Sequence, residues 1–131
     1  MIDHVSIGVV DLERAKSFYD RVLTPLGYRR MMDFPFGCGY GDRVPSFWIG
    51  VPNEHDEATE KDAVIAGAGN HVAFSAPNHA AVDGFYKAGL EAGAIDNGGP
   101  GLRPHYHPAY YAAFLIDPDG NKIEAVCHKA D

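Results

Sequence analysis

The sequence has few of the features that mark secreted, membrane-spanning or redox-active proteins. It contains only two cysteines, Cys38 and Cys127, and no CxxC pair, so we expect isolated thiols of a reducing compartment. No stretch of about 18 apolar residues occurs, and the first residues carry no cationic segment followed by an apolar one. We therefore predict a cytoplasmic protein without a membrane span or a secretory signal.

Positive charge is scarce as well. Eleven Lys and Arg residues stand against 18 Asp and Glu residues, which gives a formal net charge of -7, and no basic run is present. Proteins that bind nucleic acid or anionic lipid use clustered Lys and Arg to neutralise phosphates. We therefore expect neither nucleic acid nor a membrane as a partner, and a small molecule remains the expected ligand.

An internal repeat organises the chain. The segment His4–Ile7 corresponds to His71–Phe74, Phe18–Tyr19 to Phe85–Tyr86, and Leu23 to Leu90, always 67 residues apart (71 − 4, 85 − 18 and 90 − 23). A constant offset across a strand and the following helix indicates two copies of one unit. We predict a single domain over 1–131, with module one at about 1–52, an acidic linker at 53–69 and module two at about 70–129.

Each module begins with an alternating strand and an amphipathic helix. Asp11 and Asn78 are candidate N-caps, while Gly27 and Gly93 are candidate stops for the two helices. Further strands are expected at 28–33, 37–41 and 46–51 in module one and at 94–96, 110–116 and 122–128 in module two. The predicted fold is α+β, with two βαβββ repeats forming an open eight-stranded mixed sheet shaped like a cup.

Three residues are candidate metal ligands. His4 and His71 occupy equivalent positions on the strand face opposite the apolar one, and Glu124 takes that face in the last strand. Two imidazoles and a carboxylate from different strands suit Fe, Mn, Zn, Ni or Co as a divalent ion, with positions left for water or substrate oxygens. The ordinary alternative is hydrogen-bonded structural histidines and a carboxylate at the rim.

The segment 103–111 is dense in groups that bind or transfer protons near neutral pH. We interpret His105, His107 and Tyr111 as candidate catalytic residues, and Trp48, Arg103 and Tyr110 as candidate substrate-binding residues. The alternative for the segment is a loop packed by aromatics with surface imidazoles. Trp48 either stacks on a substrate or fills module one's half of the cup.

These motifs together resemble the vicinal oxygen chelate superfamily of glyoxalases, bleomycin resistance proteins and extradiol dioxygenases. The resemblance rests on His4–Val9, Asp11–Leu12, Phe18–Tyr19, His71–Val72, and Asp117–Asn121 leading to Glu124. It implies paired βαβββ modules, metal ligands on the first and last strands of modules, and a cup often completed by dimerisation. A homodimer that binds a small-molecule substrate is therefore expected.

The chain departs from two patterns within that superfamily. The fourth ligand of glyoxalase I, a glutamate, falls on Trp48, and the tyrosine of the extradiol signature falls on Phe114. The leading hypothesis is a metal-dependent, lyase or isomerase type enzyme that binds an oxygenated or aromatic substrate through two oxygens. The alternatives are an extradiol-type dioxygenase and a metal-free small-molecule binding or resistance protein.

Overall fold

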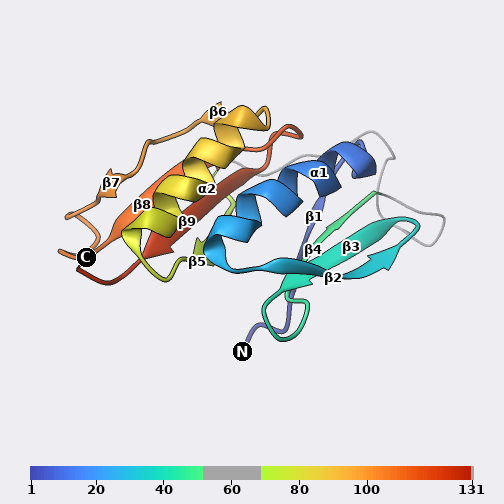
Figure 1. The fold of residues 1–131 in the computed structure, drawn as a ribbon, viewed down its shortest axis with the longest axis horizontal. Helices are drawn as coiled ribbons and strands as arrows, with labels where there is room; N and C mark the ends of the chain where they lie inside the picture. The colour runs from blue at the N-terminus through green and yellow to red at the C-terminus, as the bar shows by residue number, and fades with distance from the viewer. Residues whose placement is uncertain (52–68, 131) are drawn as a thin grey trace.

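Each half of the chain forms its own mixed sheet, and one helix packs on each sheet (Figure 1). The structure is a computed structural model that describes residues 1–51 and 69–130. The first half comprises β1 (Val5–Gly8), α1 (Leu12–Leu23), a 3₁₀ turn (Thr24–Leu26), β2 (Arg29–Phe34), β3 (Gly37–Gly41) and β4 (Phe47–Gly50). The second comprises β5 (His71–Ser75), α2 (His79–Glu91), β6 (Ile95–Asp96), β7 (Gly101–Leu102), β8 (Tyr111–Ile116) and β9 (Lys122–Cys127).

The sheets share one topology. The strand order is β1-β4-β3-β2 in the first and β5-β9-β8-β6 in the second, with β7 also paired to β8. β1 runs parallel to β4 and β5 parallel to β9, while the remaining pairs are antiparallel. The predicted α+β fold with two mixed-sheet repeats is thus confirmed. The predicted linker at 53–69 lies, apart from Gly69, outside the described residues.

The structure differs from the prediction in its strand count, because the described residues form two separate sheets with nine strands. The extra strand, β7, begins at the last residue of a glycine-rich segment, 97–101. This segment pairs with β8, since the Asn97 N–H donates to the Phe114 carbonyl at 3.0 Å and the Phe114 N–H to the Gly98 carbonyl at 2.8 Å. Gly98 has φ +137°, which a residue with a side chain rarely adopts.

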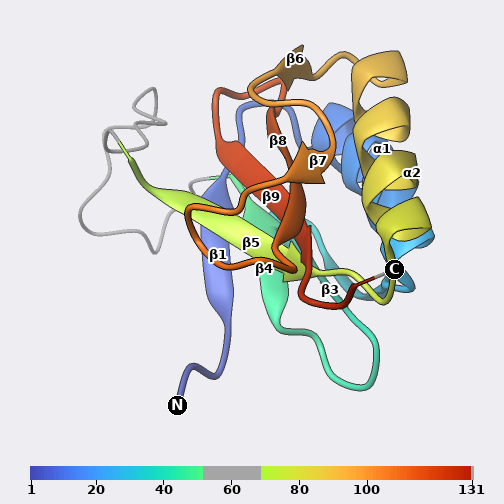
Figure 2. The same ribbon diagram turned by 90° about the vertical axis from the view of Figure 1, so that its left-hand side faces the viewer.

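Both helices begin at the predicted caps. The Asp11 carboxylate accepts from the Arg14 N–H at 3.0 Å, and the Asn78 side chain accepts from the Ala81 N–H at 2.8 Å. The helices lie side by side on the same side of the two sheets, which leaves the opposite sheet faces uncovered by helix (Figure 2). Among the described residues, no helix has the length and apolarity needed to cross a membrane.

The face that α2 buries differs by one residue from the expected stripe. Leu90, the repeat partner of the buried Leu23, is 41% exposed, and Gly89 is buried in its place. A Cβ added at Gly89 would lie 2.2 Å from Cδ1 of Leu115 and 3.6 Å from Cγ1 of Val22. The glycine therefore lets α2 approach both β8 and α1, which explains a residue that weakens the isolated helix by roughly 1 kcal/mol.

A hairpin of the second half fastens the two halves together. The turn Asp117–Asn121 reaches the end of β1, where the Asn121 amide donates to the Gly8 carbonyl at 3.0 Å. Oδ1 of Asp119 accepts from the Val10 N–H at 2.9 Å and from Arg14 at 2.8 Å. The Tyr19 hydroxyl donates to the buried Asp117 at 2.5 Å. The aromatic core continues across the junction, with Phe47 and Phe74 edge to face at 4.8 Å.

We expect Gly89→Ala to destabilise the protein although alanine favours helix. Because the new methyl group must displace Leu115, overpacking should lower the free energy of unfolding by about 1–3 kcal/mol, which exceeds the gain in helix propensity. Urea denaturation measures the change. Lys87→Ala, at an exposed site of the same helix, should change stability by less than about 0.5 kcal/mol. A Gly89→Ala variant as stable as the parent would contradict the close approach.

Candidate functional site

A buried carboxylate lies on the face of the second sheet that the helices do not cover. The register places Phe114 of β8, Glu124 of β9 and Ala73 of β5 in one row across the sheet. Glu124 is 1% exposed, whereas its neighbours Ile123 and Ala125 point into the core. A buried carboxylate is costly unless hydrogen-bond donors or a cation satisfy it, so its partners define the site.

Two side chains contact the Glu124 carboxylate. The Tyr110 hydroxyl donates to Oε1 in a short hydrogen bond, and Nε2 of His71 lies 3.1 Å from Oε2. The other ring nitrogen of His71, Nδ1, lies 3.2 Å from the Gly69 carbonyl oxygen. Since a carbonyl only accepts, Nδ1 carries a proton. A neutral His71 then turns the lone pair of Nε2 toward an oxygen that also only accepts, so a proton or a metal ion must lie between them.

The spacing of these two atoms fits neighbouring ligands of one metal ion. Bonds of about 2.1 Å at a right angle would separate the nitrogen and oxygen by roughly 3 Å, close to the 3.1 Å between Nε2 of His71 and Oε2 of Glu124. The fit is limited to these two ligands. Within 1–51 and 69–130, no group of three or more His, Cys, Asp or Glu is placed to hold a metal ion.

His4, the third expected ligand, is not brought to this pair within one chain. Its Nδ1 lies 2.6 Å from Oδ1 of Asp3, and its side chain is about half exposed, at 52%. In Figure 2 the N-terminus, just before β1, lies at the bottom, and the beginning of β5 lies at the upper left. The structure thus assembles two of the three residues, and the complete ligand set stays a prediction.

Aromatic rings enclose Tyr110, which we expected to bind substrate. Ring centres of Tyr106, His107 and His128 lie 4.9, 5.3 and 5.2 Å from that of Tyr110. Burial, followed by the hydrogen bond to Glu124, raises the pKa of Tyr110 well above its usual value. The hydroxyl therefore stays protonated at neutral pH and can hold Oε1 of Glu124 in place.

His107, a predicted general acid or base, is bonded through both ring nitrogens. Its Nδ1 accepts from the Ala109 N–H at 3.1 Å, so Nε2 carries the proton and donates to Nδ1 of His128 at 2.7 Å. His105, the other candidate, is exposed and lies against Tyr106 with ring centres 4.3 Å apart. Neither imidazole is hydrogen-bonded to Glu124 in the described structure.

His128 is part of these surroundings, and the sequence analysis did not name it as a site residue. The signal that could have found it is the register of the predicted hairpin, since Ile116 pairs with Lys122. Pairs in such a hairpin have a constant sum of residue numbers (116 + 122 = 238 = 110 + 128), which sets Tyr110 opposite His128. The same sum pairs Phe114 with Glu124, as observed (114 + 124 = 238).

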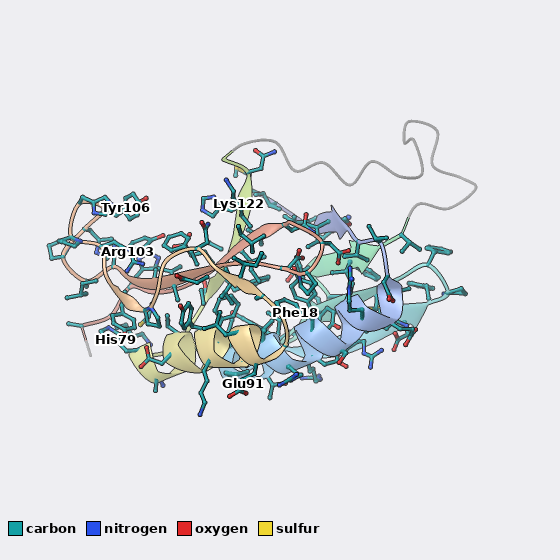
Figure 3. The ribbon with its side chains drawn as sticks, turned by 90° about the horizontal axis from the view of Figure 1, so that it is seen from above. Phe18, His79, Glu91, Arg103, Tyr106 and Lys122 are labelled. Carbon is teal, nitrogen blue, oxygen red and sulfur yellow. The ribbon has the colours of Figure 1, made fainter. Side chains whose placement is uncertain are left out.

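Arg103, a predicted substrate-binding residue, holds the glycine-rich segment. Its guanidinium donates to the carbonyls of Gly99 at 2.8 Å and Gly101 at 2.7 Å, and Cζ lies 5.4 Å from the centre of the Phe114 ring. Figure 3 shows Tyr106 and Lys122 on the side of the sheets away from the helices, whereas Phe18 lies between sheet and helix. The Arg103 guanidinium covers the ring of Phe114, the register partner of Glu124.

Tyr111, the remaining catalytic candidate, lies on the opposite face of β8. Its hydroxyl donates to Asp83 of α2 at 2.7 Å, and its ring stacks on His79 at 3.8 Å with an angle of 5° between the planes. The alternation along β8 explains this placement, because Tyr111 and Phe114 are an odd number of residues apart. Tyr111 is therefore not brought to Glu124.

Trp48 belongs to an aromatic surface on the first sheet. Its ring stacks on Phe34 at 6.0 Å, and Phe34 in turn stacks on Phe36 at 6.1 Å. A Cβ at Gly39 would lie 2.8 Å from the indole, so the absence of a side chain at Gly39 allows the Trp48 ring to pack there. Phe34 and Phe36 are 42% and 44% exposed. This surface and the Glu124 site belong to different sheets of the same chain.

Known proteins share this arrangement of elements. A 34% identical glyoxalase/bleomycin resistance protein from Albidiferax ferrireducens T118 matches with a TM-score of 0.81 over 95% of this chain and 97% of that one. A putative glyoxalase from Bacillus halodurans is 27% identical, with a TM-score of 0.64 over 97% and 95%. A lactoylglutathione lyase from Agrobacterium tumefaciens is 20% identical, with a TM-score of 0.67 over 97% and 92%, and shares the fold.

Among curated proteins, none matches the chain. The family model described as the Glyoxalase/Bleomycin resistance protein/Dioxygenase superfamily matches residues 1–125. This match ends within β9, just beyond Glu124. The chain therefore belongs to the glyoxalase/bleomycin resistance protein/dioxygenase superfamily.

Proposed function

We propose that the protein is a metal-dependent enzyme of the glyoxalase type that binds a small oxygenated or aromatic substrate through two neighbouring oxygens. The observation that carries the proposal is the pair formed by His71 Nε2 and Glu124 Oε2, 3.1 Å apart, with Nδ1 of His71 held by a carbonyl. Fe, Mn, Zn, Ni or Co as a divalent ion would supply a Lewis acid for developing enolate charge. Lyase or isomerase chemistry is the form proposed.

The third ligand is proposed to come from a second copy of the chain. His4 precedes β1 on the same strand face as the exposed Ser6, which lies in the sheet that carries Trp48. In a twofold dimer, the first sheet of one chain can cover the second sheet of the other and form two equivalent cups. The exposed Phe34 and Phe36 support this arrangement, because a monomer rarely leaves adjacent aromatics in water.

Within that cup, the residues of the chain have separate tasks. Tyr110 fixes one oxygen of Glu124 and so orients the other toward His71. The exposed His105, or His107 through its bond to His128, is proposed to transfer the substrate proton as general acid and base. Trp48, stacked beside Phe34, provides the wall for an apolar or aromatic part of the substrate. A cytoplasmic location is part of the proposal.

A metal-free binding protein is the second candidate. The described residues contain no group of three metal-binding side chains, and the surface of Phe34, Phe36 and Trp48 offers stacking area without any ion. In this case a proton, not a metal ion, lies between His71 and Glu124. The protein would then retain an aromatic ligand and show no turnover.

Metal analysis separates the two candidates. Protein purified without chelators and without a nickel column should contain about one metal ion per chain, and His71→Ala, Glu124→Gln and His4→Ala should each lose it. His105→Ala is the matched control, since it removes an exposed imidazole that is not a proposed ligand. A parent protein that is metal-free and cannot be loaded with any of the five ions would contradict the enzyme and support the binder.

The origin of the third ligand has a test of its own. Co-expression of His4→Ala with Glu124→Gln yields mixed dimers in which one site has both mutations and the other has none. If the ligands come from two chains, about a quarter of all sites should recover metal after random mixing. Recovery well below this value, in dimers shown to be mixed by mass spectrometry, would place all ligands in one chain.

Tyr110→Phe should weaken metal binding without removing a ligand. Because the phenylalanine cannot donate to Oε1, Glu124 loses the contact that orients it, and the affinity should fall about 10–100-fold. Competition with a coloured chelator measures this change. Tyr106→Phe is the control, since Tyr106 is 60% exposed and stacks through its ring. An unchanged affinity in Tyr110→Phe would contradict the positioning role.

A further inference from the structure

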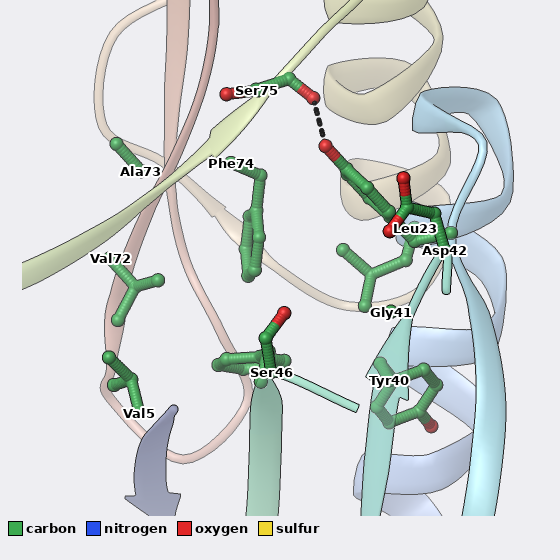
Figure 4. A pocket seen from close by; sticks show the side chains of 12 residues that line it. Val5, Leu23, Tyr40, Gly41, Asp42, Ser46, Val72, Ala73, Phe74 and Ser75 are labelled. Carbon is green, nitrogen blue, oxygen red and sulfur yellow. Dashed lines mark hydrogen bonds between the residues drawn. The ribbon is translucent and has the colours of Figure 1, made fainter. Parts of the chain in front are cut away.

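A pocket of about 320 Å³ lies at the junction of the two halves (Figure 4). Its wall is formed by residues from both sheets and from the end of α1. In the view of Figure 4, Phe74 lies between Val72 on one side and Leu23 on the other, with Ser46 below it. The volume falls at the lower end of the range of roughly 300–1,000 Å³ for ligand pockets, which suits a molecule with a single ring.

This pocket is distinct from the proposed metal site. Phe47 and Phe74, which line it, belong to the hydrophobic core between sheets and helices. The neighbouring positions His4 and Trp48 alternate to the other face. Ala73, the register partner of Glu124, also lines the pocket, so the two sites adjoin at this residue. Glu124 and Tyr110 are not among the lining residues.

The pocket lies where a hydrogen bond that joins the two halves at one junction has no counterpart at the equivalent junction. The repeat offset makes Ser75 the counterpart of Gly8 (8 + 67 = 75), and Val5 pairs with Phe47 as Val72 pairs with Ile123. Ile123 is therefore the counterpart of Phe47, 76 residues earlier in the chain (123 − 47 = 76). The same offset makes Pro45 the counterpart of Asn121 (121 − 76 = 45). Proline has no side-chain donor to reach across the junction.

The carbonyl of Ser75 is instead reached by Tyr28, whose hydroxyl donates to it at 2.8 Å. Asn121 and its hairpin close the junction at Gly8. The equivalent place, near the turn after Gly41, holds the pocket, which Phe74 and Ser46 both line.

The polar end of the pocket is rich in acceptors and carries negative charge. Asp42 and Ser46 are exposed at its rim, and Arg29 donates to the main-chain carbonyl of Asp42, at 3.1 Å, rather than to its carboxylate. The Asp42 carboxylate accepts from the Arg43 backbone N–H at 2.7 Å. Burial, and then the negative charge of Asp42, raise the pKa of the Tyr28 hydroxyl.

The apolar part of the pocket is built for an aromatic ring. Phe47 and Phe74 meet edge to face at 4.8 Å, and Tyr40 lies 6.4 Å from Phe47 with the planes tilted by 42°. Rings arranged in this way present both edges and faces, which favours a further ring over a chain of equal area.

The geometry points to a binding site in this pocket for a small primary amine that carries an aromatic ring, with the ammonium group at Asp42 and Ser46 and the ring against Phe47, Phe74 and Tyr40. The negative charge of Asp42 at the rim favours the ammonium group, and the aromatic lining favours the aromatic ring of the ligand. The ligand contacts both halves of the chain, so its binding stabilises their junction.

The test compares 2-phenylethylamine with phenylacetate, which has the same ring with a negative group in place of the ammonium. Isothermal titration and ligand-observed NMR at low salt should show the amine binding at least about tenfold more tightly. Asp42→Asn should reduce amine affinity about tenfold, because the charged partner is lost. Glu91→Gln, which removes an acid from the exposed end of α2, should leave both affinities unchanged.

Two further variants locate the ligand. Ser46→Trp fills the pocket and should abolish amine binding, and Val72→Phe does so from the opposite wall if the first variant folds poorly. Glu124→Gln should leave amine binding unchanged, so failure of the metal proposal and failure of this one are distinguishable. Equal binding of the two probes, no amine binding at about 10 mM, or loss of amine binding in Glu124→Gln would overturn the proposal.

Discussion

The need to satisfy one buried carboxylate organises the second sheet. Glu124 lies among apolar neighbours with 1% exposure, and each of its oxygens requires a donor or a cation. Oε1 accepts a hydrogen bond from Tyr110, which holds the segment before β8 against the sheet. Oε2 faces His71, whose tautomer is set by the Gly69 carbonyl. Two chain segments far apart in sequence are thus fixed by the chemistry of a single side chain.

The same constraint explains the aromatic surroundings of the site. Tyr110 can reach Glu124 only if its ring crosses the sheet surface, and the rings of Tyr106, His107 and His128 pack around it. Arg103 braces the neighbouring glycine-rich segment through the carbonyls of Gly99 and Gly101. The segment that the sequence marks as rich in proton-transfer groups therefore serves first as scaffold for the carboxylate.

The sequence predicted those features that depend on local periodicity. Alternation gave the strands, Asp11 and Asn78 gave the helix starts, and the constant offset gave the two equivalent halves. Periodicity assigns a residue to a face but does not place one sheet relative to another. For this reason it led us to expect His4 beside His71, which a single chain does not provide.

Two further differences, the buried face of α2 and the formation of β7, arise because sequence patterns do not include tertiary contacts. A helical stripe is uncertain by one residue, and the packing of α2 on Leu115 decided between Gly89 and Leu90 in favour of the smaller side chain. Glycines such as those at 97–101 are typical of a loop, but the edge of β8 offered this segment backbone partners, and β7 formed at its end. Tertiary contacts decided both cases.

The contacts of Asp117–Asn121 with the first half affect how the molecule tolerates a rearranged chain order. Its hydrogen bonds to Gly8, Val10 and Arg14 join the halves through space, in addition to the covalent connection between them. These contacts do not depend on the chain segment that connects the two halves. A protein joined in this way is open to circular permutation and to fragment exchange during evolution.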